Sequence, residues 1–228
     1  NSFLQTVSGI DLVVGARGDA IPILLYSVFR LGEATNNLRW RSYLEWTGDE
    51  RVEWAIPLSL GDSHKGYRVL GTTSDYWKHY KYSNNRKIEL QAGEFFDELY
   101  DAVIGSVVAE KLGYRLNQQI VIAHGAGSAA LFEHDDQPFQ VVRILKPTGT
   151  PVDQTIHVSL EAIEATYIDW EDGFPSTETA NPETIGLSDL QPRSITAFLV
   201  TPPKCILFEY KKRLTHIRRN LFQQFCLV

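Results

Sequence analysis

Residues 100–145 constrain the fold of this chain most, because they carry the pattern of a strand, a helix and two further strands. The apolar run DAVIG at 101–105 is typical of a strand that is buried on both faces. In the next segment, SVVAEKL at 106–112, apolar residues recur at helical spacing, which predicts a helix. Gly113 follows directly and can end that helix in a left-handed conformation.

Two β-branched segments complete this central unit: QIVIA at 119–123 and FQVVRIL at 139–145. Both are predicted as strands. The segment 124–138 between them is rich in Gly, Ala and Asp, and is predicted to be a hairpin connection. The unit has no pattern typical of an active site. Composition and pattern alone therefore predict a soluble α+β protein.

The rest of the chain alternates short strands and helices. Strands are predicted at residues 10–16, 52–60, 67–72, 155–158 and 195–200, and helices at 41–46, 75–80 and 160–165. GDSHKG at 61–66 is interpreted as a loop, which would make the flanking strands a hairpin. The acidic segment 169–188 contains two prolines and two glycines, and it is the best candidate for a mobile excursion or a lobe crossover.

A chain of 228 residues can bury one full core or form two lobes. No apolar run reaches the roughly 18–20 residues that cross a bilayer. The nearest, AIPILLYSVF at 20–29, is too short and contains Pro22. The sequence does not begin with a signal-peptide pattern. Because it has no Met and begins with Asn, we interpret it as a processed chain or an excised piece.

The net charge of −6 is unevenly distributed. Residues 204–228 hold six Lys/Arg and one acid, a net charge of +5, which leaves −11 for the rest. The acidic body argues against a general nucleic-acid binder. The basic tail is consistent with anionic lipid, nucleic acid or, as we prefer, a solvated helix face. Cys205 and Cys226 both lie in this tail, and a disulfide between them stays open.

Several local motifs are weak when their context is considered. Gly125–Ala130, GAGSAA, matches the dinucleotide fingerprint, but EHDDQP at 133–138 stops any helix and the expected downstream acid is missing. His124, His134, Asp135 and Asp136 do not have an established metal-ligand spacing. The RGD triplet at 17–19 is interpreted as a turn.

Acidic and aromatic pairs also have simpler explanations than catalysis. Glu94 with Asp97, and Glu161 with Glu164, are interpreted as solvated faces. The aromatic group Tyr76, Trp77 and Tyr80 is interpreted as core or as a lobe interface. The sequence contains no GxSxG elbow and no Walker A motif. We therefore predict no catalytic, cofactor-binding or metal-binding residue.

A series of segments in one order nevertheless resembles a known family. The segments are DLVVGAR at 11–17, residues 20–29, TNN at 35–37, PLSLGDSHKG at 57–66, residues 67–72, SDYWKHY at 74–80, VIGSVVAEKL at 103–112, residues 139–147 and VDQTIHVSLEA at 152–162. This series resembles the extracytoplasmic core domain of MacB-like, FtsX-type ABC-transporter permeases. The resemblance covers roughly residues 3–200.

The resemblance implies a two-lobed α+β fold. A discontinuous porter-like lobe of the split βαβ type would comprise residues 1–97 and 190–228. A mixed, β-rich sabre-like lobe, residues 98–189, would be inserted into it. The tail from Pro202 departs from the family pattern. It could still supply a closing helix at 207–221 that leads back towards the membrane.

The resemblance also implies a function without catalysis. Such a domain is the periplasmic part of an inner-membrane permease, and it transmits conformational change driven by a separate ABC ATPase subunit. Its partner would be a periplasmic protein, or a lipoprotein or peptide cargo, and the whole protein would be dimeric; no nucleic acid or cofactor is implied. Two alternatives stay open: a free-standing peptide- or lipid-binding module, which needs a concave apolar pocket, and an enzyme, which needs converging titratable groups.

Overall fold

The structure is a computed structural model that describes residues 6–18, 20–34, 36–92, 98–124, 138–168, 190–202 and 223–227. The chain forms two compact units, and each is built from separate stretches of sequence. Unit 1 comprises Asn1–Leu60, Asp75–Ile88 and Ser194–Val228. Unit 2 comprises Gly61–Ser74 and Glu89–Arg193. Both ends of the chain therefore belong to unit 1.

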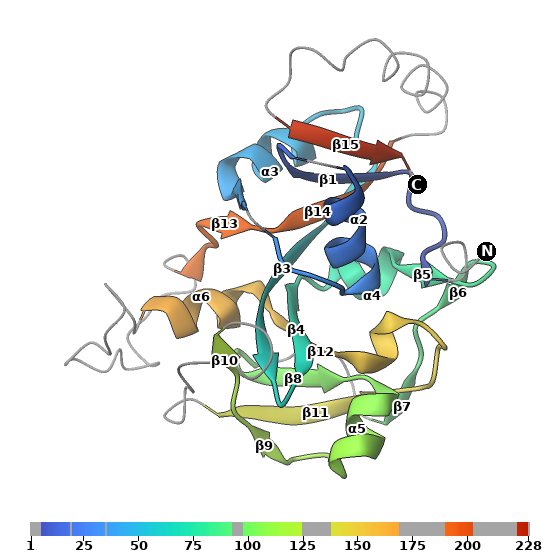
Figure 1. Cartoon of the computed structure of the whole chain (residues 1–228), viewed down its shortest axis with the longest axis vertical. Helices are drawn as coiled ribbons and strands as arrows, with labels where there is room; N and C mark the ends of the chain where they lie inside the picture. Colours follow the sequence, from blue (N-terminus) through green and yellow to red (C-terminus); the bar gives the residue numbers. More distant parts are fainter. Residues whose placement is uncertain are drawn as a thin grey trace. The chain divides into compact units, whose positions relative to one another are not determined.

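Unit 1 contains an antiparallel sheet with the order β15-β1-β14-β3. Its strands are β1 (Leu12–Ala16), β14 (Ala197–Thr201), β15 (Gln223–Leu227) and β3 (Trp54–His64), of which residues 54–60 belong to this unit. Strand β1 lies between the two C-terminal strands (Figure 1). Its residues are mostly apolar and buried, as a central strand requires.

Three helices and two small sheets also lie within the described residues of unit 1. The helices are α2 (Ala20–Phe29), α3 (Trp40–Thr47) and α4 (Asp75–His79). The small sheets pair β2 (Leu38–Arg39) with β13 (Ser194–Ile195), and β5 (Lys81–Tyr82) with β6 (Arg86–Lys87). Helix α2 packs on β1, β14 and β15, and α3 places Tyr43 and Trp46 edge-on against Phe198 of β14.

Unit 2 contains a mixed sheet with the order β4-β12-β8-β11-β7. The strands are β4 (Tyr67–Thr72), β12 (Thr155–Ser159), β8 (Asp101–Ile104), β11 (Phe139–Leu145) and β7 (Leu90–Ala92), with the short β9 (Gln119–Ile120) on β11 and β10 (Ala123–His124) on the end of β3. The β4–β12 and β8–β11 pairs are parallel, and the other pairs are antiparallel.

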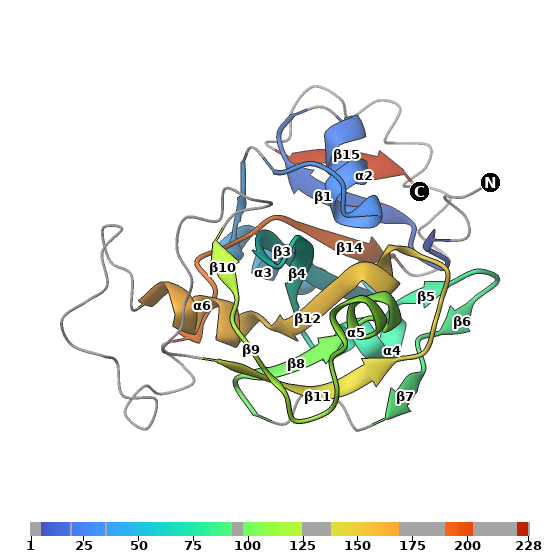
Figure 2. The same ribbon diagram turned by 60° about the horizontal axis from the view of Figure 1, so that its bottom comes forward.

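The strand, helix and final strand of the central unit predicted from the sequence are confirmed, whereas most of the connection expected at 124–138 lies outside the described residues. Strand β8 leads through Gly105 into α5 (Ser106–Leu112), and the chain returns by β9 to β11, which lies parallel to β8 (Figure 2). Gly113 ends α5 with φ of 69°, in the left-handed region that favours glycine. The 3₁₀ helix η2 (Pro151–Gln154) contacts α5.

The core of unit 2 lies where α5 and α6 (Leu160–Ile168) cover the sheet. It combines buried side chains from the strands and from both helices: Val69, Ala102, Ile104, Val108, Tyr114, Ile120, Ile122, Phe139, Val141, Ile156, Val158, Ala162 and Ile163. The side chain of Ser159 accepts a hydrogen bond from the backbone N–H of Ala162 at 3.0 Å, which agrees with its expected place at the start of α6.

One predicted boundary, between the strand at 52–60 and the loop at 61–66, needs correction. Residues 61–64, expected in a loop, continue β3, because Asp62 and Ser63 pair with the distant strand β10. The β3–β4 connection is only Lys65 and Gly66, both with positive φ, as in a tight two-residue hairpin turn.

Two predicted strands are also interrupted. The strand expected at 119–123 is divided into β9 and the first residue of β10. The strand expected at 195–200 is divided between β13 and β14 at Thr196, whose hydroxyl bonds the backbone of Leu60. The segment 169–188 and the helix expected at 207–221 lie outside the described residues.

Candidate functional site

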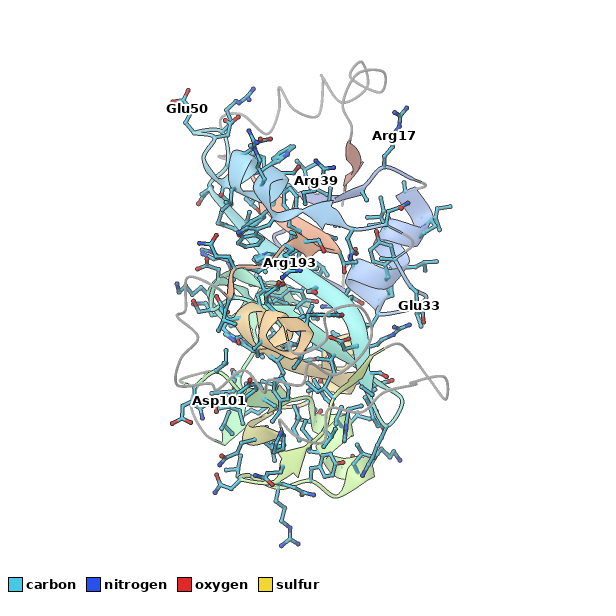
Figure 3. The ribbon with its side chains drawn as sticks, turned by 90° about the vertical axis from the view of Figure 1, so that its left-hand side faces the viewer. Arg17, Glu33, Arg39, Glu50, Asp101 and Arg193 are labelled. Carbon is cyan, nitrogen blue, oxygen red and sulfur yellow. The ribbon has the colours of Figure 1, made fainter. Side chains whose placement is uncertain are left out.

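Most motifs weighed in the sequence lie outside the described residues. These are residues 125–130, His134, Asp135, Asp136, Glu94, Asp97, Asp19 and Cys205. Arg17 is exposed and points away from the ribbon (Figure 3). Cys226 lies in β15, opposite Val13 of β1. The prediction of no catalytic, cofactor or metal residue stays a prediction.

The strongest group of titratable side chains lies in unit 2, at the end of β3. We call Asp62, His64, Tyr114 and Tyr167 the β3-end cluster. Asp62 and His64 point to the same face because side chains alternate along a strand, and both are buried. Tyr114 follows α5, and Tyr167 lies in the last turn of α6. The cluster therefore joins three elements of unit 2.

Both nitrogens of the His64 ring contact a hydrogen-bonding partner. Nδ1 lies 2.5 Å from the carbonyl oxygen of Val121, and Nε2 lies 2.7 Å from the hydroxyl of Tyr114. A carbonyl can only accept, so Nδ1 carries a proton; in a neutral ring Nε2 then accepts from the Tyr114 hydroxyl. Lys65 lies over the Tyr114 ring, 5.4 Å from its centroid. The ring of His64 thus holds the end of β3 to the segment after α5.

The second half of the cluster joins β3 to α6. The Tyr167 hydroxyl donates to Asp62 at 3.3 Å. Burial of this hydroxyl and the nearby Asp62 carboxylate raise the pKa of Tyr167, although 44% of the residue is exposed. One turn earlier on α6, the buried Glu164 pairs with Arg193 at 3.2 Å. Arg193 is labelled in Figure 3. Glu164 is thus not the solvated acid expected from the sequence.

Unit 1 contains a second buried polar group, around α4. Tyr76 and Tyr80 stack with ring centroids 4.6 Å apart, and the Tyr80 hydroxyl donates to the carbonyl of Thr6 at 2.9 Å. Arg30 ends α2 with φ of 60°, donates to the carbonyl of Ser27 and lies close enough to interact with Tyr76. The aromatic residues of α4 are therefore core, as the sequence indicated. They fix the first described residues of the chain to α4.

Neither group has the arrangement of a hydrolase site. Ser63 follows Asp62 and precedes His64, but its side chain points to the opposite face of β3. Among the residues that the structure describes, no three His, Cys, Asp or Glu side chains are grouped so that they could hold a metal ion. The described contacts of both groups connect secondary-structure elements.

The buried hydroxyls of these groups predict an alkaline titration. Burial raises the pKa of Tyr43, Tyr76, Tyr80 and Tyr167 above the ordinary value of about 10. We expect the absorbance step near pH 10 of the native chain to account for no more than six of its ten tyrosines. All ten should titrate together in denaturant.

The sign of the coupling to stability follows from the raised pKa values. Above pH 10 the unfolded chain loses tyrosine protons that the folded chain keeps, so the free energy of unfolding should fall as pH rises. Urea unfolding at pH 9 and pH 11 measures this change. If all ten tyrosines ionised together near pH 10 in the native chain, this would contradict the burial of the four tyrosine hydroxyls with raised pKa values.

No helix within the described residues combines the length and the apolar character that crossing a bilayer requires.

The solved structures similar to this chain include two extracytoplasmic domains that align with nearly the whole chain. The extracellular domain of the noncanonic ABC-type transporter YknZ from Gram-positive bacteria aligns with a TM-score of 0.51 at 10% identity, covering 95% of this chain and 98% of that one. The periplasmic region of MacB from Actinobacillus actinomycetemcomitans aligns with a TM-score of 0.51 at 7% identity, covering 98% and 91%. No protein-family model and no curated protein matches the sequence.

These similarities confirm the α+β fold expected from the sequence, and they agree with the family resemblance at the level of fold. The chain has the fold of the extracytoplasmic domains of YknZ and MacB.

Proposed function

We propose that this chain is the extracytoplasmic domain of an ABC-type permease subunit. In this role it carries out no catalysis. It transmits conformational change, driven by ATP hydrolysis in a separate nucleotide-binding subunit, to a periplasmic partner protein or to a lipoprotein or peptide cargo. The whole protein would be embedded in the inner membrane and dimeric. The fold shared with the extracytoplasmic domains of YknZ and MacB supports this proposal.

One observation carries the proposal: the first strand of the chain pairs with its last two strands. Leu12 of β1 lies opposite Val200 of β14 on one side and opposite Leu227 of β15 on the other. Residues paired in this way are about 5 Å apart between Cα atoms. A domain inserted between two membrane segments needs its two ends close together. The register of β1 meets that requirement.

The division into units suggests how motion could pass through the domain. We propose that unit 1 is the porter-like lobe and unit 2 the inserted, sabre-like lobe. The chain passes between the units after Leu60, Ser74, Ile88 and Arg193, so four covalent connections join them. The boundaries predicted from the sequence differ from the units at 61–74, 89–97 and 190–193, which belong to unit 2. Those boundaries stay a prediction.

Chemical labelling of the complete protein in intact cells tests the location. Both native cysteines are replaced by serine, and one cysteine is placed at Arg17, whose side chain is exposed. We expect a membrane-impermeant maleimide to label it equally before and after the cells are broken. Val13→Cys is the matched control, because Val13 is fully buried and should stay unlabelled in the folded protein.

Labelling of Arg17→Cys only after cell disruption would overturn the proposal. Labelling from outside, in a protein that purifies without any membrane segment or ATPase subunit, would instead favour the free-standing binding module.

A further inference from the structure

A short hairpin in unit 1 carries three cations that form no ion pair with a described carboxylate. It consists of β5, β6 and the turn between them, residues 81–87 (KYSNNRK), and we call it the basic hairpin. Arg86 and Lys87 are exposed and Lys81 is half-buried. No ion pair joins any of the three to a carboxylate in the described part of the chain. Their charge is thus available to an external anion.

The register of the hairpin places like charges opposite each other. Lys81 pairs with Lys87 across the two strands, so their side chains stand on one face. Side chains in this relation have Cβ atoms about 5 Å apart, and like charges there are destabilising. An anion bound at this face would remove that repulsion.

The opposite face of the hairpin carries an aromatic residue beside a cation. Tyr82 pairs with Arg86 and is half-exposed. A tyrosine ring has an apolar body and a polar end, which suits the boundary between headgroups and acyl chains. The turn itself is polar, and Ser83, Asn84 and Asn85 all have positive φ. The hairpin thus combines cations, an aromatic ring and a hydrophilic end.

The hairpin adjoins the first described residues of the chain. The backbone N–H of Ser8 donates to the carbonyl of Lys81 at 2.8 Å. A Cβ on Gly9 would lie 3.4 Å from the side-chain oxygen of Asn85. Residues 6–9 therefore run beside the hairpin, and an extended chain from Thr6 to residue 1 spans at most about 18 Å. If a membrane segment precedes residue 1, the hairpin is within reach of the headgroups.

The charges of the two units have opposite signs. Unit 1 holds 15 Lys/Arg and 9 Asp/Glu, a net charge of +6, whereas unit 2 holds 7 and 19, a net charge of −12. An anionic surface would attract the first unit and repel the second. The sign of this asymmetry favours an arrangement in which unit 1 faces the surface.

We propose that the basic hairpin binds the anionic headgroups of the membrane in which the complete protein is anchored. This inference rests on the proposed function, since it takes a membrane segment to lie next to unit 1. Lys81, Arg86 and Lys87 supply the attraction, and Tyr82 contacts the interface. The nearness of the hairpin to residues 6–9 favours lipid over an acidic protein, which would have no reason to lie beside the start of the chain.

Binding of the purified full chain to vesicles tests the inference. The vesicles are phosphatidylcholine alone or with about 30% phosphatidylglycerol, and bound protein is measured by sedimentation. We expect binding only to the anionic vesicles, weakening as salt rises. Each cation near such a surface contributes about fivefold, so Lys81→Gln, Arg86→Gln and Lys87→Gln together should weaken binding on the order of a hundredfold.

The matched control removes three exposed cations from unit 2: Lys65→Gln, Lys111→Gln and Arg115→Gln. It changes the net charge equally and should bind like the unchanged chain. If the control loses as much vesicle binding as the hairpin variant, then the net charge of the chain determines binding, and the inference fails. The inference also fails if the unchanged chain does not bind anionic vesicles, or if this chain binds an immobilised acidic polypeptide but no vesicle.

Folding and the proposed function are checked separately. Lys87→Gln alone removes the like-charge pair, so its unfolding midpoint should equal or slightly exceed that of the unchanged chain while vesicle binding falls. Unaltered binding in that folded variant and in the triple variant would overturn the inference. Labelling of Arg17→Cys from outside the cell does not involve the hairpin. If Arg17→Cys is labelled from outside but the chain does not bind anionic vesicles, only the hairpin inference is refuted. If the chain binds the vesicles but Arg17→Cys is not labelled from outside, the proposed function is refuted.

Discussion

Gly105→Ala is expected to destabilise unit 2 by about 3 kcal/mol, because no space exists for a side chain at this position. A Cβ built on Gly105 would lie 2.3 Å from the carbonyl oxygen of Asp153 and 2.5 Å from that of Val152. These are backbone atoms of η2 and cannot rotate away. Gly105 also donates its N–H to the carbonyl of Thr155 at 2.9 Å, which holds the two segments together.

Thermal unfolding measures this effect. For a chain of this length the midpoint should fall by about 6–12 °C. Gly18→Ala is the matched control, because the nearest atom to its Cβ would be 3.9 Å away and its backbone is not left-handed. The control should stay within about 1 °C of the unchanged chain. Equal midpoints for the two variants would show that β8, α5 and η2 do not pack as described.

Asp153→Ala should cost about 3 kcal/mol, because its buried carboxylate holds the turn 148–150 together. The carboxylate accepts hydrogen bonds from the backbone N–H groups of Thr148, at 2.8 Å, and Gly149, at 2.7 Å. It also accepts one from the Thr148 hydroxyl at 2.8 Å. Alanine would leave these donors without an acceptor in a site where Asp153 is only 6% exposed.

Urea unfolding of three variants separates this effect from the loss of charge. Asp153→Asn keeps one acceptor oxygen and should lose about half as much free energy of unfolding as Asp153→Ala. Asp75→Ala removes an exposed carboxylate that pairs with Lys78 on α4, and it should cost less than about 1 kcal/mol. A cost for Asp153→Ala no larger than for Asp75→Ala would contradict the role of this side chain in the turn.

Local pattern was enough to predict the elements whose partners are close in sequence. The β8–α5–β11 unit followed from an apolar run, a helical repeat and Gly113, all within 46 residues. Helices α3 and α4 and the β3–β4 hairpin followed in the same way. In each case the residues that decide the conformation are neighbours along the chain.

Long-range pairing could not be predicted in this way. Residues 61–64 look like a loop because Gly, Asp and Ser favour turns, but β10, some 60 residues later, pairs with them as a strand. The pairing of β1 with β15 joins opposite ends of the chain. Helix α2 is apolar nearly all round, so it shows no helical periodicity, and Pro22 is tolerated in its first turn.

The β3-end cluster was hidden for the same reason. Asp62, His64, Tyr114 and Tyr167 come from positions spread over about 100 residues, and none belongs to a recognised motif. The alternation of Asp62 and His64 around Ser63 was the only local signal. The family resemblance, by contrast, used the order of many weak segments, and the fold comparisons agree with it.

The most direct test of the proposed function is a distance measurement between the units in the complete protein with its ATPase. Spin labels are placed at Glu50→Cys in unit 1 and Arg115→Cys in unit 2, with Cys205 and Cys226 replaced by serine. A control pair, Arg17→Cys and Glu50→Cys, lies within unit 1. We expect the distance between the units to change when ATP is bound and trapped, while the control distance stays constant. An unchanged distance between the units through the ATP cycle would contradict the transmission of motion by this domain.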